Sequence, residues 1–271
     1  MRRRVAGDGI ELAVLDEGEA DRPAVLLVHG FPDSSNLWRH QVPALTAAGV
    51  RAIAPDMRGF GESDRPQAAE QYRITRAVSD LVAVLDALGI ERARVVGHDW
   101  GAAIAWVFAA LHPRRVERLV AMSVGHPGAQ RRTISDREKA WYTLLFQFEG
   151  VAEELLRRDE WKLFREWLRE DGDVDRYLAD LSRPGALTAG LNWYRANLHP
   201  ARQLRRGPRS PPSKRRRSAS GAVATTTSMR SRCCARASTS PGRGATSAST
   251  ARATGCSSTR PTTSTSCCSS S

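Results

Sequence analysis

Short, mainly apolar runs alternate with helical patterns along the first half of the chain, and this alternation restricts the possible folds more than any other feature. The apolar runs cover residues 11–16, 24–28, 51–56, 93–99 and 116–124, with helical spacing at 37–48, at 74–88 and from residue 100. Continuous Val, Leu, Ile and Ala are typical of strands buried on both faces. The sequence therefore predicts an α/β fold with a mostly parallel sheet between helices.

The strand pattern stops near residue 128, and apolar residues then recur at helical spacing as far as residue 199. Two examples are Trp141, Leu144, Leu145 and Phe148, and Trp161, Phe164, Trp167 and Leu168. A helical insertion after a strand of an open α/β sheet would lie above the carboxyl edge of the sheet, where such folds bind ligands. We therefore expect the N-terminal part of a core domain at 1–127 and a helical cap at 128–204.

The composition changes abruptly after Leu204. Residues 205–271 contain no Leu, Ile, Phe, Tyr or Trp, and Ser, Thr, Ala, Arg, Gly and Pro dominate. Such a segment cannot bury enough apolar surface to offset its ordering entropy, so we expect a disordered, low-complexity tail. The predicted fold is thus truncated before the C-terminal strands of the sheet.

Charge divides at the same boundary. The tail carries 13 Lys or Arg and no Asp or Glu, which leaves 28 basic against 29 acidic residues at 1–204. The net charge of +12 is therefore a property of the tail. Because the part predicted to fold is nearly neutral, we expect no nucleic-acid partner for it.

Cysteine and hydropathy patterns exclude further classes. All five cysteines lie in the tail, and no histidine pair has metal-ligand spacing, so we expect no disulfide, metal or other cofactor. No apolar stretch has the length of a membrane span, and the basic N-terminus lacks an apolar signal segment. These features predict a cytoplasmic protein without a membrane partner and do not define its oligomeric state.

A sharp strand-to-helix turn is predicted at Gly97-His98-Asp99-Trp100-Gly101-Ala102. Small residues flank the centre of such a turn because larger side chains do not fit, and the turn exposes the central side chain to the pocket. Asp99 is therefore the candidate nucleophile. The alternative is an ordinary Asp that stabilises a helix N-terminus.

Two further loops follow strands in a matching order. His29-Gly30-Phe31-Pro32 comes directly after the run at 24–28, and a glycine-containing turn occupies residues 56–64. A loop in the first position can donate a backbone N–H, here from Phe31, to an oxyanion hole completed by the N–H of Trp100. The second motif taken alone is equally compatible with a simple tight loop.

In these motifs and their spacing, residues 8–204 closely resemble the epoxide hydrolases of the α/β-hydrolase superfamily. The resemblance implies that Asp99 attacks a saturated carbon of the epoxide and forms an ester. Water activated by a histidine then hydrolyses the ester to a vicinal diol, while the oxyanion hole holds the tetrahedral intermediate. No cofactor takes part.

The resemblance also implies two cap tyrosines that act as general acids toward the epoxide oxygen. Tyr142 within residues 141–147 and Tyr194 within residues 192–195 match these positions. Core tyrosines with satisfied hydroxyl groups are the alternative. The substrate pocket is expected to include His29, Pro32, Trp38, Trp141, Phe146 and Trp193, whose aromatic character favours a small apolar epoxide without specifying which one.

Two other functions remain possible from these residues. Haloalkane dehalogenases also place Trp after the nucleophilic Asp, but they do not need the two tyrosines. A rival of another class is a non-catalytic protein whose basic tail, with Lys214-Arg215-Arg216-Arg217, binds nucleic acid.

The sequence departs from the family pattern in its catalytic triad. No His follows His199 and no Asp or Glu follows Asp180, and the other position for the acid holds only Ser123, Val124 and Gly125. Because a triad needs a histidine and an orienting acid, we expect the printed chain to be inactive or trapped as the ester.

A shifted reading frame from about residue 205 would account for this departure. Codons formed from the last base of one codon and the first two of the next allow residues 252–271 to be read as TGHWLQLDAPDDVNELLLEF. This reading resembles the family's catalytic-histidine loop and final helix. Residues 213–222 can likewise be read as VKAPTLGVWG, a buried strand.

Overall fold

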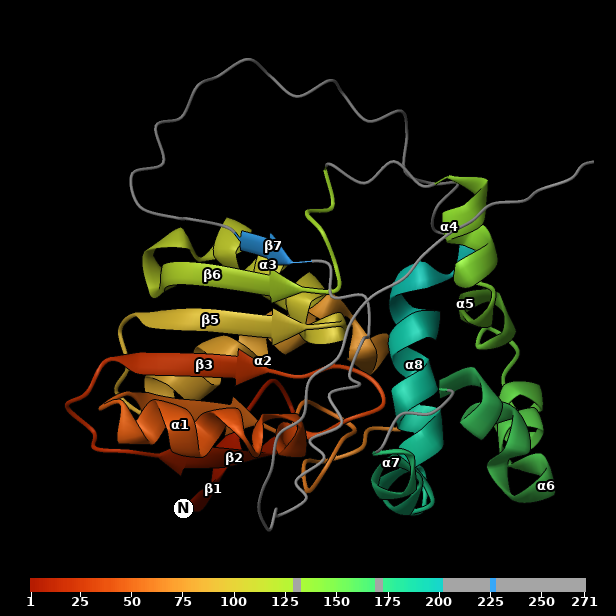
Figure 1. Ribbon diagram of the computed structural model, residues 1–271, viewed down its shortest axis with the longest axis horizontal. Coiled ribbons are helices and arrows are strands. Elements are labelled where there is room, and N and C mark those ends of the chain that lie inside the picture. The colour runs from red at the N-terminus through yellow and green to blue at the C-terminus, as the bar shows by residue number, and fades with distance from the viewer. Residues whose placement is uncertain (129–132, 169–172, 202–224, 228–271) are drawn as a thin grey trace, which may run out of the picture. The chain divides into compact units, whose positions relative to one another are not determined.

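The computed structural model describes residues 1–128, 133–168, 173–201 and 225–227 (Figure 1). Residues 225–227 are described by their backbone alone. Its sheet has the strand order β1-β2-β4-β3-β5-β6-β7. Strands β3 to β7 pair in parallel, whereas β2 pairs antiparallel with β1 and β4. The strands are β1 (Arg2–Ala6), β2 (Glu11–Glu17), β3 (Ala24–Val28), β4 (Arg51–Pro55), β5 (Ala93–His98), β6 (Val116–Met122) and β7 (Thr225–Thr227).

The predicted α/β fold with a mostly parallel sheet is confirmed, and the central strands explain the sequence pattern. Every residue of β3 and β4 is buried. Strand β1 was not predicted from the sequence. Val5 is its one buried residue, so this strand contains no apolar run. It lies at the antiparallel edge of the sheet, next to β2.

Helices cover both faces of the sheet. Leu26, Val28 and Val95 face a large apolar cluster shared with α2 and α3, and Val25 and Leu27 face a smaller cluster that includes Val42 of α1. This alternation follows from the period of two along a strand. The helices in this part of the chain are α1 (Gln41–Ala47), α2 (Ile74–Ala87) and α3 (Trp100–Leu111), with 3₁₀ turns at Ser35–Trp38, Ala69–Tyr72 and Pro113–Arg115.

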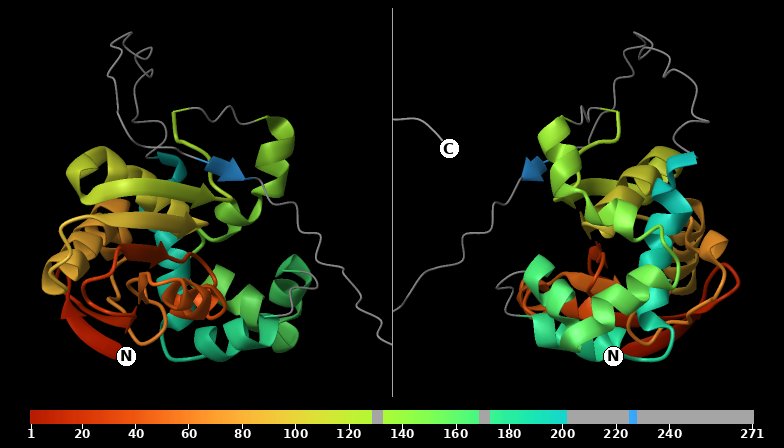
Figure 2. Two further views of the ribbon diagram at one scale, coloured as in Figure 1. Left: turned by 60° about the vertical axis from the view of Figure 1, so that its left-hand side comes forward. Right: turned by 90° about the vertical axis from the view of Figure 1, so that its right-hand side faces the viewer.

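In the described part of the chain five further helices follow β6, and we call them the cap helices. They lie beyond the carboxyl ends of the parallel strands (Figure 1), and α8 runs beside the sheet domain in both further views (Figure 2). Residues Arg158–Trp161 have non-helical backbone angles and divide α6 into two helical segments. The cap helices are α4 (Ile134–Lys139), α5 (Tyr142–Leu145), α6 (Val151–Leu168), α7 (Val174–Leu181) and α8 (Ala186–Leu198).

Helix α8 attaches the cap helices to the sheet domain through polar side chains. The Trp193 Nε1–H donates to the Arg58 carbonyl at 3.2 Å, and the Asn192 amide donates to the Gln67 carbonyl at 3.2 Å. Asn197 accepts from the Ile74 N–H at 3.0 Å and also donates to a backbone carbonyl. These bonds fix the register of α8, and therefore of Tyr194, against the loops above the sheet.

Most of the predicted tail lies outside the described residues. Within it, Thr225–Thr227 form β7, which pairs in parallel with Val120–Met122. For these three residues the structure differs from the expected disorder, because an edge strand presents unpaired backbone groups with which an added strand can bond. None of the helices in the described ranges combines the length and apolar character needed to cross a bilayer.

A buried ion pair joins the 56–64 loop to α2. Arg58 Nε donates to Asp80 Oδ2 at 2.8 Å and its NH2 group to Oδ1 at 2.7 Å, and both side chains are 0% exposed. Arg58 also donates to the Gln71 carbonyl at 2.6 Å. The Arg58 side chain therefore connects the 56–64 loop, α2 and the 3₁₀ turn Ala69–Tyr72.

We predict that Arg58→Ala lowers the free energy of unfolding by about 3–5 kcal/mol, because it leaves the Asp80 carboxylate buried without its partner. Urea denaturation would measure the loss. The control is Glu117→Gln, which breaks a pair with Arg94 whose side chains are 38% and 39% exposed and should cost at most about 1 kcal/mol. Equal losses in the two variants would contradict the prediction.

Candidate active site

Asp99 occupies a strained turn between β5 and α3. Its φ of 53° and ψ of −120° lie outside the regions that side-chain-bearing residues ordinarily adopt. A Cβ atom added at Gly97 would lie 2.6 Å from the Gly101 carbonyl carbon. One added at Gly101 would lie 2.7 Å from the His29 carbonyl oxygen, so both would collide with the backbone. The small residues recognised in the sequence are therefore required by the close approach of α3 to β3 and β5.

Two backbone N–H groups converge on the Asp99 carboxylate. The Phe31 N–H donates to Asp99 Oδ1 at 3.0 Å, and the Trp100 N–H also hydrogen-bonds this carboxylate. Burial raises the pKa of the Asp99 carboxyl above its ordinary value, while the Trp100 N–H, the charge of His98 and the Phe31 N–H act in the opposite direction. The structure thus brings together the predicted nucleophile and both predicted oxyanion-hole donors.

His29 supports this arrangement from behind the loop. Its Nε2 accepts from the Met57 N–H at 2.9 Å, so Nδ1 carries the hydrogen and donates to the Gly30 carbonyl at 3.0 Å. Burial lowers the pKa of the ring, which favours this neutral form. Because both ring nitrogens of His29 bond backbone groups, we leave it out of the proposed pocket and assign it to holding the 29–32 and 56–64 loops together.

The two candidate acids come from separate cap helices and lie next to each other, and Tyr194 lies near Asp99. The rings of Tyr142 on α5 and Tyr194 on α8 lie 5.9 Å apart, and Tyr194 lies 5.1 Å from the Trp100 ring. Burial raises the pKa of Tyr194 well above its ordinary value, and the nearby Asp99 carboxylate and Tyr142 phenol act in the same direction. Tyr194 therefore stays protonated at neutral pH and can donate a proton or hydrogen bond.

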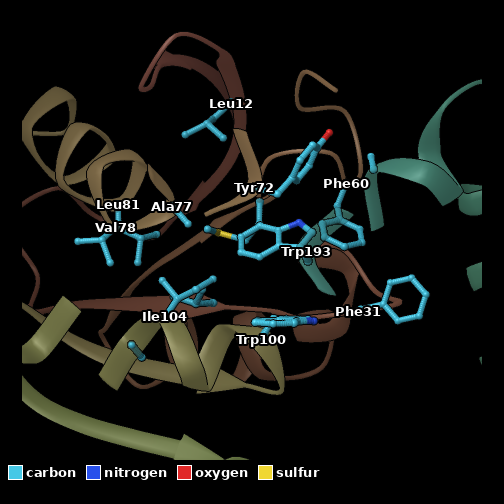
Figure 3. Packing of buried hydrophobic residues seen from close by; sticks show 14 of the residues in the cluster. Leu12, Phe31, Phe60, Tyr72, Ala77, Val78, Leu81, Trp100, Ile104 and Trp193 are labelled. Carbon is cyan, nitrogen blue, oxygen red and sulfur yellow. The ribbon is translucent and has the colours of Figure 1, made fainter. Parts of the chain in front are cut away.

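Aromatic side chains form the surroundings of these groups. The Phe31 ring lies 6.0 Å from Phe146 and 5.7 Å from Tyr194. Trp193, which is fully buried, lies against Trp100 with Phe60 and Tyr72 nearby (Figure 3). Phe146 and Trp193 thus belong to the predicted aromatic surroundings, and Pro32 is half-buried in the adjacent loop.

One tryptophan predicted for the pocket lies in the smaller core cluster and the other is about half exposed, and we leave both out of the proposed site. Trp38 packs in the smaller core cluster, with Val25 and Leu27, because its 3₁₀ turn folds onto β3 and β4. Trp141 is 46% exposed at the start of α5.

Three aromatic residues beside Phe31 were not predicted as site residues. Phe60, Phe164 and Trp167 have ring centroids 6.3, 6.1 and 6.2 Å from the Phe31 ring. Trp167 also lies 4.7 Å from Tyr142. The helical spacing of Phe164 and Trp167 was visible in the sequence, but it marks a buried helix face equally well.

The described residues contain no cluster of three or more His, Cys, Asp or Glu arranged for a metal ion. The candidate site instead combines the Asp99 carboxylate, two backbone donors and the Tyr194 phenol, with the Tyr142 ring beside that of Tyr194. This set can perform nucleophilic attack, stabilise an oxyanion and donate protons.

Comparison with known proteins agrees with this geometry. Residues 23–197 match the alpha/beta hydrolase fold family. Epoxide hydrolase A of Mycobacterium tuberculosis is 38% identical over 235 residues, covering 71% of this chain and 73% of the relative. Epoxide hydrolase 2 of Siraitia grosvenorii is 38% identical over 231 residues, covering 71% of each chain.

Solved structures agree as well. The crystal structure of epoxide hydrolase A from Mycobacterium thermoresistibile has a TM-score of 0.61 and 34% identity, and the match covers 72% of this chain and 74% of that one. The chain belongs to the α/β-hydrolase family. Within that family it is an α/β-hydrolase of the epoxide hydrolase type, as the sequence motifs indicated.

We predict that Gly101→Ala lowers the free energy of unfolding by about 1–3 kcal/mol, because the added methyl group would overlap the backbone at the end of β3. The control is Gly125→Ala, where an added Cβ meets nothing within 4 Å. Chemical denaturation followed by circular dichroism would compare the two. A Gly101→Ala protein as stable as the control would show that the turn tolerates a side chain.

Proposed function

We propose that this chain opens a small apolar epoxide by attack of Asp99 on a ring carbon. The observation that best supports the proposal is the Phe31 N–H bond to Asp99 Oδ1 of 3.0 Å. With Oδ1 held in this way, Oδ2 is left to act as the nucleophile. The aromatic side chains around Phe31 favour an apolar substrate, and the relatives named above are epoxide hydrolases.

In the first step, an electron pair of Asp99 Oδ2 forms a bond to one epoxide carbon. The bond from that carbon to the ring oxygen breaks, and the ring oxygen takes a proton from Tyr142 or Tyr194. The products are a hydroxyalkyl ester of Asp99 and a tyrosinate, which water then reprotonates. The raised pKa of Tyr194 suits it to this role, since the phenol remains protonated until the ring opens.

In the second step, water adds to Asp99 Cγ and the former Oδ1 becomes the oxyanion. The Phe31 N–H already donates to Oδ1 and the Trp100 N–H bonds the same carboxylate, which supports the proposal that these two donors stabilise the charge as it develops. Collapse of the intermediate breaks the bond between Cγ and the ester oxygen, and the leaving alkoxide takes the proton that a base removed from the attacking water, which gives the diol. A base must accept a proton from the attacking water.

This base is the group that the chain lacks in the proposed mechanism. All six histidines lie among the described residues, where His29 is fully bonded and His40, His126 and His199 are exposed. His98 precedes Asp99 on β5, and His112 lies at the opposite end of α3 from Asp99, beside Phe108. We therefore propose that the ester forms and is not hydrolysed, and that a shifted reading frame from about residue 205 removed the histidine and the acid.

We predict stoichiometric labelling of Asp99 by a small aromatic epoxide without release of diol. Intact-mass and peptide mass spectrometry would show one adduct on Asp99, and Asp99→Asn should remain unlabelled. A matched chain translated from residue 205 in the alternative frame should turn over, because that reading can restore a histidine and an acid. Sustained diol production by the printed chain would contradict the trapping.

The tyrosines distinguish epoxide opening from haloalkane dehalogenation, because halide needs no proton as it leaves. We predict that Tyr194→Phe and Tyr142→Phe each slow labelling by an epoxide by about tenfold or more, since general acids contribute about 10²–10⁴-fold. The control is Tyr177→Phe, a buried tyrosine of α7. Faster labelling by an alkyl bromide than by the epoxide, with no sensitivity to Tyr194→Phe, would favour the dehalogenase.

A further inference from the structure

An ion pair connects the loop that carries Phe31 to the cap helices. Arg176 of α7 donates from NH2 to Asp33 Oδ2 at 2.8 Å and from NH1 to Asp33 Oδ1, a bidentate arrangement. The Asp33 side chain is 5% exposed and that of Arg176 is 25% exposed. A bidentate pair with one buried partner fixes orientation as well as distance.

Asp33 transmits this anchoring to the backbone of its own loop. The Asp33 N–H donates to the Gly30 carbonyl at 3.0 Å and closes the turn that contains Phe31. Asp33 Oδ1 also accepts from the Ser34 N–H at 2.7 Å, so the carboxylate is fixed relative to the chain on either side. The N–H that reaches Asp99 thus lies inside a turn closed by Asp33.

A second arginine provides a natural comparison. Asp173, at the N-terminus of α7, accepts from Arg176 NH2 at 3.0 Å and from Arg39 NH2 at 2.9 Å. Arg39 belongs to the sheet domain, so its pair also joins cap and core. Of these contacts, the pair between Arg176 and Asp33 is the one that reaches the loop carrying Phe31.

We propose that Arg176 is a positioning residue for the reaction: it holds the Gly30–Asp33 turn so that the Phe31 N–H points at the Asp99 carboxylate. The inference rests on the proposed function of Asp99. It assigns to the cap helices a role in forming the oxyanion hole, in addition to supplying the tyrosines. Lysine cannot replace the arginine fully, because a single ammonium group lacks the two parallel donors.

The test compares Arg176→Gln with Arg39→Gln, which each remove a cap-to-core ion pair, the first with Asp33 and the second with Asp173. The first readout is amide hydrogen exchange in the peptide covering residues 30–34. The second is the rate of Asp99 labelling by an epoxide, measured over a range of concentrations to separate maximal rate from half-saturation. Arg176→Lys serves as the conservative variant, and circular dichroism checks that each variant is folded.

We expect Arg176→Gln to accelerate exchange in residues 30–34 and to slow maximal labelling by about tenfold or more, with half-saturation little changed, because a small displacement of a catalytic donor is costly. Arg39→Gln should stay near the wild type, and Arg176→Lys should fall between. Equal behaviour of the Gln variants in both readouts would overturn the proposal. If the wild type is not labelled at Asp99, the proposed function fails, and the exchange rates alone decide whether Arg176 orders the turn.

Discussion

The close approach of the first turn of α3 to the end of β3 is the constraint on which the site depends. Strands β3 and β5 pair in parallel, with Val28 opposite Gly97, so the loops that follow them start side by side. Gly101 then lies against the backbone of Val28 and His29, and Gly30 lies against the Trp100 nitrogen. A side chain at either glycine would separate the two loops. The convergence of two N–H groups on Asp99 is thus a consequence of backbone packing.

The placement of the tyrosines depends on a different interaction, centred on Arg195 of α8. This buried arginine donates to Glu153 of α6 at 2.8 Å from both NH1 and NH2, and its Nε donates to the Phe146 carbonyl at 2.9 Å. It therefore joins its own helix to the end of α5 and the start of α6. Since Tyr194 precedes Arg195 and Tyr142 begins α5, one guanidinium relates the two phenols to each other.

The sequence predicted the parts of the site that local backbone chemistry determines. Continuous apolar runs marked the central strands, and the glycines around Asp99 marked a turn that tolerates little else. The direction of Trp38 was not predictable because either face of the sheet can bury a tryptophan. The pair between Asp33 and Arg176 left no local pattern, because its partners are 143 residues apart. Such contacts follow from the packing of the helices, which spacing alone does not define.

Burial acts on the two kinds of reacting group in opposite ways. It raises the pKa of Tyr194, which keeps the candidate acid protonated, and it also raises the pKa of Asp99, which disfavours the carboxylate needed for attack. The two N–H donors oppose the second effect because they stabilise the charged form of Asp99. In the proposed mechanism the two donors therefore act before any ester exists, and a loop displaced from Asp99 would weaken the proposed nucleophile as well as the later oxyanion hole. Anchoring that loop to the cap helices links the donors to the helices that bring the acids.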